Sequence, residues 1–248
     1  MKTFKIAHLY YDLMNLYGEN GNVRFLVKKL EEQDLDVEVH FLTIGDKIDF
    51  KKYDFYYMGM GSEQNQNLVY EDIIKYKKDI INAINNKKFF LITGNSLELF
   101  GKNIKYLDGT SKEAIGAYGF ECLEEEFRIV GEQYYKTDLI SHNVIGFLNR
   151  QTVMSDNGDN LFKVLKGCGY NPKINFEGIH DNNFYGTYLL GPILVRNPYL
   201  CDYFIKEICN YLNTDYKNPK KDNLAYKAYH EYLKNFIENQ DLKNQSHF

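Results

Sequence analysis

Short apolar runs alternate with amphipathic segments over the first hundred residues, and this alternation constrains the fold more than any other feature. The apolar runs predict buried strands over residues 5–10, 37–42, 55–59 and 89–92. Between them, apolar side chains at helical spacing predict helices over 22–33 and 67–86. Strands that alternate with helices across short loops form a parallel sheet covered on both faces. We therefore predict an α/β fold with ligand sites at the carboxyl ends of its strands.

The second half of the chain has a different pattern, in which turn-rich segments separate short strands. These strands are predicted over 127–135, 144–147, 174–176 and 184–189. A helix over 198–213 follows, and residues 222–238 form a terminal amphipathic helix. We predict one domain over 1–213 with a C-terminal helical extension over 214–248.

Composition is that of a soluble globular protein and argues against several functions. The 248 residues are 44% apolar and 26% charged, and no apolar run approaches the roughly 20 residues of a membrane helix. A net charge of −4 leaves no basic surface for nucleic acid or anionic lipid. The four cysteines lack CxxC spacing, so we expect no disulfide framework, metal site or cofactor. The N-terminus is too polar for a secretory signal, which predicts a cytoplasmic protein.

A strand–turn–helix pattern runs from Leu91 to Gly101, with its turn at Gly94. In nucleophilic enzymes such a turn projects one reactive side chain above the sheet, close to amide donors of a neighbouring loop. Gly94 has no side chain to project, but glycine tolerates the positive φ that the turn demands. We predict that the backbone turn is kept without a nucleophile. The alternative is that Gly94 is an ordinary turn residue after a strand.

Six segments, in order and spacing, resemble the GatD-type glutamine amidotransferases, a CobB/CobQ-like class I group, over nearly the full chain. They are residues 13–18 with 21–22, 59–66, 128–132, 145–149, 186–192 and 222–223. The resemblance implies a flavodoxin-like class I glutamine amidotransferase fold, with a mostly parallel central sheet and helices on both faces. It also implies a Mur-ligase-like partner of the MurT type, amidation of lipid II in cell-wall synthesis, and glutamine as a ligand.

Carried over by position, the resemblance places the two reactive groups at residues that cannot react. The nucleophile falls on Gly94, where the family has cysteine, and the base falls on Leu190, where it has histidine. Arg128 matches the arginine proposed to hold glutamine, which it would grip by a bidentate pair. Alternatively, Arg128 pairs at a strand edge with a glutamate among residues 124–126.

Other substrate-binding positions also depart from the family pattern. The loop of Gly59, Met60 and Gly61 has methionine in place of one oxyanion-loop glycine. Asn95 stands where the family has glycine, and Glu98 where it has glutamine. We expect these residues to line the binding site.

Glutamine hydrolysis by this fold needs a thiolate and an imidazole, so we considered displaced substitutes for them. Ser96 is more typical of a helix cap, and Thr93 of packing at a strand end. Cys122 is interpreted as a small buried apolar residue, His180 as a surface histidine, and His8 as a satisfied core histidine.

Three hypotheses for function remain open. The first is a degenerate subunit that docks on its Mur-ligase-like partner without releasing ammonia. The second is an active glutaminase with displaced catalytic groups. The third is an amino-acid-binding regulatory module. The tyrosines of the terminal helix either contact a partner or pack within the chain.

Overall fold

A single mixed sheet forms the centre of the molecule, in a computed structural model that describes residues 3–155, 158–219 and 223–238. Its strands are β1 (Phe4–Leu9), β2 (Val37–Leu42), β3 (Phe55–Met58), β4 (Phe89–Thr93), β5 (Asn103–Lys105), β6 (Ser111–Glu113), β7 (Glu121–Lys136), β8 (Val144–Met154), β9 (Asn160–Lys166), β10 (Phe176–Asp181) and β11 (Phe184–Thr187). Their order is β2-β1-β3-β4-β11-β10-β9-β7-β5-β6, and β8 pairs with β7. The five strands from β2 to β11 are parallel, which confirms the α/β fold expected from the sequence.

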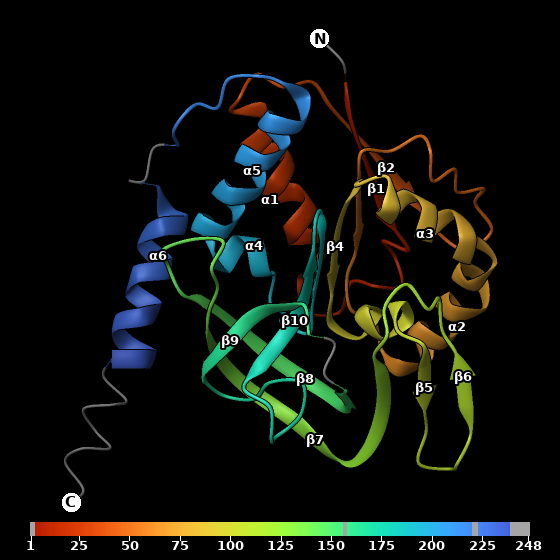
Figure 1. Ribbon diagram of the computed structural model, residues 1–248. Helices are drawn as coiled ribbons and strands as arrows, with labels where there is room; N and C mark the ends of the chain where they lie inside the picture. Colours follow the sequence, from red (N-terminus) through yellow and green to blue (C-terminus); the bar gives the residue numbers. More distant parts are fainter. Residues whose placement is uncertain (1–2, 156–157, 220–222, 239–248) are drawn as a thin grey trace, which may run out of the picture.

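Helices cover both faces of the parallel part (Figure 1). They are α1 (Asn20–Glu31), α2 (Glu63–Ile73), α3 (Lys77–Asn85), α4 (Ile193–Arg196), α5 (Pro198–Leu212) and α6 (Leu224–Tyr232). Short segments of tighter or wider helix are η1 (Leu16–Gly18), η2 (Ile74–Tyr76), η3 (Gly94–Phe100) and η4 (Leu233–Glu238). Helices α1, α4 and α5 pack on one another on one face, and α2 and α3 lie on the other.

The innermost strands are buried along their whole length, as their continuous apolar sequences require. Every residue of β3 and β4 is buried. Aromatic rings from neighbouring strands stack there, with the centroids of Tyr56 and Phe90 4.6 Å apart. This packing holds the carboxyl ends of the strands in fixed register beneath the loops that follow them.

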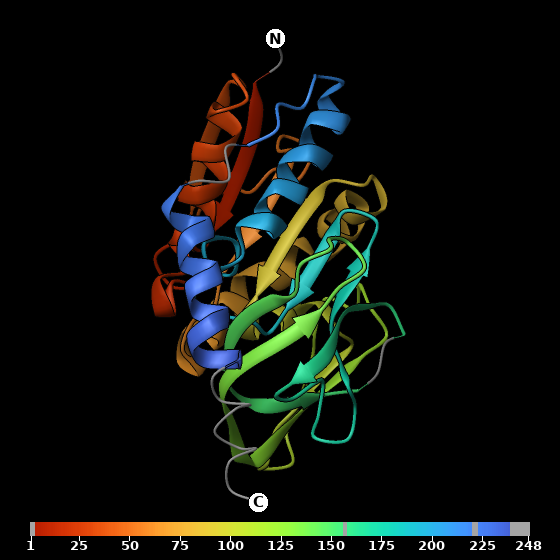
Figure 2. The same cartoon turned by 90° about the vertical axis from the view of Figure 1, so that its left-hand side faces the viewer.

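The antiparallel strands β7 to β10 gather at the end of the molecule opposite the N-terminus in both views (Figures 1 and 2). Strands β7 and β8 are longer than predicted, and β5, β6 and β9 were not predicted. The strand predicted over 174–176 was wrong, because Ile174 bonds back to Asn171 in a turn and β10 begins at Phe176.

The helix predicted over 67–86 is two helices. It begins earlier, at Glu63, because the side chain of Ser62 accepts a hydrogen bond from the amide of Asn65 and caps α2. The turn η2 then separates α2 from α3. The terminal helix predicted over 222–238 is seen from Leu224, and residue 222 lies outside the described residues.

Candidate functional site

Three loops meet at the carboxyl edge of the parallel sheet. Strand β4 is in register with β3, Met58 opposite Ile92, and with β11, Thr187 opposite Thr93. The residues that follow these strands are therefore neighbours. They are the loop of residues 59–61, the elbow at Gly94 and the segment of Leu190.

The space above the elbow is filled by apolar side chains. Gly94 has φ +65°, as expected for the sharp turn. A Cβ atom added at Gly94 would lie 2.5 Å from Cβ of Met60 and 2.8 Å from Cδ2 of Leu190. Both side chains are almost completely buried, at 3% and 1% exposed. The two residues thus occupy the place where a side chain at position 94 would project.

The loop that would carry amide donors is closed by a side chain. Asn95 accepts a hydrogen bond from the amide of Gly61 (3.2 Å) and donates one to its carbonyl (3.0 Å). That amide is therefore not free to stabilise an oxyanion. Glycine is required at 59 and 61, because a Cβ at either position would lie 2.6 Å from an atom of Met14.

A small polar cavity of about 180 Å³ adjoins the filled elbow. Its wall includes Met60, Asn95, Glu98, Arg150 and Thr152. Burial raises the pKa of Glu98, against hydrogen bonds donated by Thr152 and by Gln66. Arg150 donates to the carbonyls of residues 152 and 170 and is 3% exposed.

Arg128 lies at the rim of this edge rather than inside the cavity. Its guanidinium donates to Oδ1 of Asn149 (2.8 Å) and forms an ion pair with Glu63. The expected partner among residues 124–126 was thus wrong. Burial of Glu63 opposes ionisation, but the hydrogen bond from Arg128, a backbone hydrogen bond and the positive charge of Arg128 together outweigh it and lower the pKa of that carboxyl.

A buried carboxylate that the sequence analysis missed lies beneath the elbow. Glu19 is completely buried and accepts hydrogen bonds from the amide of Gly191 (3.1 Å), the hydroxyl of Tyr57 (3.0 Å) and the hydroxyl of Thr93. Burial raises the pKa of Glu19 to about 7, although these hydrogen bonds act in the opposite direction. Glu19 thereby connects the residue before Gly94 to the residue after Leu190. Its only sequence signal was its place between the two parts of the N-terminal family segment.

The displaced nucleophiles considered from the sequence are poorly placed. Ser96 is completely buried and donates its hydroxyl to the carbonyl of Gly59. Cys122 is buried beside the hydroxyl of Tyr188, and burial raises the pKa of its thiol well above its usual range. Neither presents the accessible, ionisable group that a nucleophile requires.

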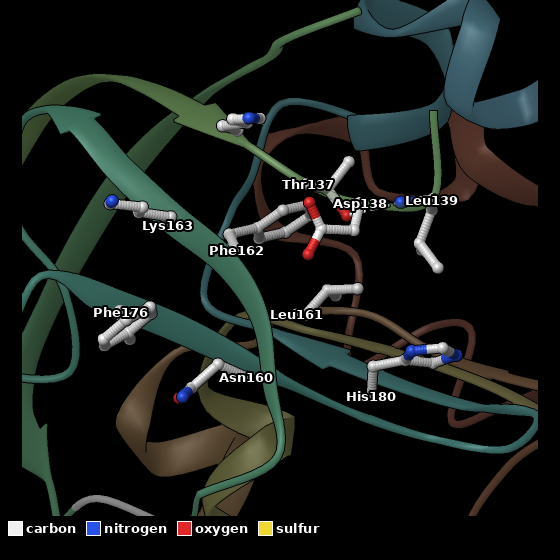
Figure 3. A pocket seen from close by; sticks show the side chains of 10 residues that line it. Thr137, Asp138, Leu139, Asn160, Leu161, Phe162, Lys163, Phe176 and His180 are labelled. Carbon is white, nitrogen blue, oxygen red and sulfur yellow. Dashed lines mark hydrogen bonds between the residues drawn. The ribbon is translucent and has the colours of Figure 1, made fainter. Parts of the chain in front are cut away.

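Neither histidine weighed from the sequence lies among the elbow residues. His180 is half-buried at the end of β10, where its ring stacks on Tyr185 at 4.7 Å. It faces a different cavity of about 420 Å³ (Figure 3), whose wall also includes Asp138 and Phe162. His8 is a core residue, but neither ring nitrogen has a hydrogen-bond partner in the described chain, so the expectation of a satisfied histidine was wrong.

No described helix is long and apolar enough to span a membrane. No group of three or more histidine, cysteine or acidic residues within the described ranges is arranged to hold a metal ion. All four cysteines are unpaired.

The parallel sheet and its strand–elbow edge define the fold class of the glutamine amidotransferases. A glutamine amidotransferase from Thermotoga maritima shares this fold with a TM-score of 0.52, at 9% identity, over 94% of this chain and 93% of the other. Residues 5–198 match the CobB/CobQ-like glutamine amidotransferase domain. The chain therefore belongs to the CobB/CobQ-like glutamine amidotransferase family.

Two curated relatives have the same name, lipid II isoglutaminyl synthase (glutamine-hydrolyzing) subunit GatD. The protein of Streptococcus pneumoniae (strain ATCC BAA-255 / R6) is 30% identical, over 98% of this chain and 93% of its own length. The protein of Staphylococcus aureus (strain N315) is 28% identical, over 91% of this chain and 92% of its own length. The resemblance to GatD-type proteins is confirmed.

Proposed function

We propose that this chain is a cytoplasmic, non-hydrolysing GatD-type subunit that docks on a Mur-ligase-type partner of the MurT kind in the amidation of lipid II. The proposal rests on one observation. The space that a nucleophile at position 94 would need is taken by the buried side chains of Met60 and Leu190. The role in lipid II amidation comes from the names of the two relatives.

The chemistry of the elbow supports the absence of hydrolysis. Attack on the amide of glutamine needs a thiolate or alkoxide, a base to take its proton, and donors for the oxyanion. Position 94 has no side chain, Leu190 has no proton acceptor, and the amide of Gly61 is bonded to Asn95. The partner would then take ammonia from free ammonium rather than from glutamine.

The rim of the site supports a docking role. Tyr17 and Val130 are 43% and 56% exposed, and both lie beside Asn149. With Arg128, which also bonds Asn149, they form an exposed surface of mixed apolar and charged character around the filled elbow. Such a composition suits a protein interface, in which aromatic residues and arginine are enriched.

The test is an assay of the chain with and without its Mur-ligase-type partner. Glutamate release from glutamine is measured beside amidation of lipid II, with either glutamine or ammonium as the nitrogen source. We expect no glutamate above the buffer level in either sample, and amidation with ammonium alone. The Streptococcus pneumoniae relative with its own partner is the positive control.

The opposite result would favour an active enzyme with displaced groups. Robust glutamine hydrolysis that is abolished by Ser96→Ala or by Cys122→Ala would overturn the proposal. Two results would count against the docking role alone. One is failure of the partner to bind the wild-type chain, and the other is unchanged partner affinity of a folded Tyr17→Ala/Val130→Asp variant.

A second candidate function is that of an amino-acid-binding regulatory module, favoured by the cavity beside the elbow. Arg150 lines this cavity, and its Nε is buried without a hydrogen-bond partner in the described chain. Titration calorimetry with glutamine and with glutamate tests this function. Saturable binding that Arg128→Ala leaves unchanged would exclude the inherited mode of holding glutamine.

A further inference from the structure

A further groove, which shares no lining residue with the cavity beside the elbow, lies between helix α1 and strands β1 and β2. Its volume is about 600 Å³, within the range of small-molecule sites. Strand β2 is the last strand of the sheet, so the groove is open along the side of the molecule. Its apolar wall includes Val23 and Val27 of α1 and Val39 and Phe41 of β2.

The inner wall of the groove contains a histidine with unmet hydrogen-bonding capacity. His8 is completely buried, and neither Nδ1 nor Nε2 has a partner in the described chain. Burial, with a smaller effect of Arg24, lowers the pKa of His8 to about 4, so the ring is neutral at pH 7. A neutral imidazole has one donor and one acceptor. Leaving such groups buried and unpaired is costly, and native structures seldom do so without a ligand, a water or a function to account for it.

The outer wall of the groove is positively charged at one end. Arg24 and Lys28 lie one turn apart on α1, and both are exposed and line the groove. Neither has an ion pair within the described residues. Asn20, one turn before Arg24, has a buried Oδ1 that is also unpartnered. Glu31 is the acidic residue of the wall and lies about 10 Å from Arg24 along the helix, so the Arg24 end is the one suited to an anion.

We propose that this groove is a binding site for a small aromatic anion, such as an aryl carboxylate with a ring N–H group. Its ring packs between the valines of α1 and Phe41. Its carboxylate pairs with Arg24 and Lys28, and its N–H donates to the free acceptor nitrogen of His8. This arrangement pairs the charges of Arg24 and Lys28 and the acceptor nitrogen of His8 with one ligand.

Access to His8 requires one side chain to move. The ring of His8 packs beside Phe41 and Tyr11, with centroids 5.7 Å and 6.2 Å away. Phe41 is 57% exposed, so a change of its rotamer is unhindered on the solvent side and fast. The ring of Phe41 in its new position then covers the bound ligand.

The test uses indole-3-acetate as the probe and neutral indole-3-acetamide as its matched analogue. Affinities are measured by titration calorimetry on the full chain, and the ring nitrogens of His8 are followed by ¹⁵N NMR, assigned by their loss in His8→Phe. We expect the acetate to bind about tenfold more tightly than the acetamide, because a charge-assisted pair is lost. We also expect it to shift the His8 signals.

Three variants separate a ligand site from a structural role. His8→Phe is expected to reduce acetate affinity at least tenfold while its melting temperature stays equal or rises, since an unpaired polar ring leaves the core. Arg24→Gln/Lys28→Gln alters only exposed side chains and is expected to equalise the two probes. Lys173→Gln, an exposed lysine outside the groove, is expected to change neither affinity.

Several results would overturn the inference. One is the absence of saturable acetate binding up to about 1 mM. Another is equal affinity for acetate and acetamide in the wild type. A third is unchanged binding in His8→Phe together with a lowered melting temperature, which would make His8 a purely structural residue. None of these outcomes bears on glutamine hydrolysis, so the proposed function stands or falls separately.

Discussion

At the scale of single residues, the absence of a side chain at position 94 is matched by the residues that surround it. Gly94, Met60 and Leu190 are far apart in sequence, yet the missing side chain of the first is replaced in space by the other two. The three residues fit one another because the apolar side chains of Met60 and Leu190 pack over the glycine. Restoring a side chain at position 94 alone would therefore disrupt a packed region.

A double-mutant cycle tests this coupling. Gly94→Ala places a Cβ 2.5 Å from Met60 and a non-glycine residue at φ +65°, and we expect it to lower the unfolding free energy by about 1–3 kcal/mol. In a Met60→Gly background the same substitution is expected to cost at least about 1 kcal/mol less, because the clash with Met60 is gone and only the contact with Leu190 and the backbone strain remain. Urea unfolding measures both. Equal costs in the two backgrounds would show that Met60 does not fill the site.

Buried carboxylates predict an unusual dependence of stability on pH. Burial raises the pKa of Glu19 from 4.5 to about 7, and that of Glu177 likewise to about 7. Between these values the folded protein retains a proton that the unfolded chain has released. The unfolding free energy therefore falls as the pH rises from about 4.5 to about 7, by at most about 1.4 kcal/mol per pH unit for each group.

Glu19→Gln is expected to reduce this slope, because an amide does not titrate. Glu126→Gln, which changes an exposed carboxylate, is the matched control and should leave the slope unchanged. Urea unfolding at intervals between pH 4.5 and pH 8 provides the measurement. An unfolding free energy that rises across this range would contradict the retention of protons by Glu19 and Glu177 in the folded protein.

At the scale of elements, the C-terminal helix α6 is attached to the rest of the chain by its tyrosines. Tyr226 is 1% exposed and donates to the carboxylate of Asp202 (2.7 Å), and Tyr229 donates to the carbonyl of Asn143 (2.6 Å). Tyr232 is half-buried and donates to Glu132 (2.7 Å), with Arg196 over its ring. These three tyrosines favour intramolecular packing over a free contact surface.

Removing one tyrosine hydroxyl at a time compares the contribution of the buried Tyr226 with that of the half-buried Tyr232 to the attachment of α6. Tyr226→Phe is expected to lower the unfolding free energy by about 1–2 kcal/mol, because Tyr226 is buried and its hydrogen bond goes to a charged acceptor. Tyr232→Phe is expected to cost less than about 0.5 kcal/mol, because its partner is at the surface. Thermal unfolding of the two variants gives the comparison. The reverse order of stability would show that α6 is anchored at its outer end.

At the scale of the whole molecule, one sheet and one apolar core join the two halves of the chain. Strand β11 pairs with β4 on the parallel side and with β10 on the antiparallel side. The buried core extends from Phe4 through Phe90 to Phe162 of β9. Within the described residues, no break in the sheet or in the core separates the parallel strands from the antiparallel strands.

This continuity predicts a single cooperative unfolding transition. Near-UV circular dichroism reports the packing of the tyrosines, which occur in both halves, and far-UV circular dichroism reports the secondary structure. We expect the two urea midpoints to coincide, as in a two-state transition. Separate midpoints would mean that the antiparallel part unfolds independently.

Local pattern was sufficient for the parallel half of the fold. The strand at residues 37–42 has the predicted bounds, and the one predicted over 55–59 ends one residue earlier, at Met58, because continuous or alternating apolar residues indicate burial directly. The pattern failed at 174–176, where a turn delays the strand, and within 67–86, where helix propensity continues across the break at η2. Arg128 was identified, but its partner Glu63 was not, because that pairing joins segments 65 residues apart.

The sequence by itself determined the alternation of strands and helices, the glycine at the elbow and the presence of leucine at position 190, since all of these are properties of single residues or short spacings. Only the tertiary structure decided that Met60 and Leu190 fill the vacated space, that Asn95 closes the amide of Gly61, and that His8 is buried without a partner. These features depend on which distant segments pack together. The free energy of such contacts is distributed over the whole core, so no local sequence pattern predicts them.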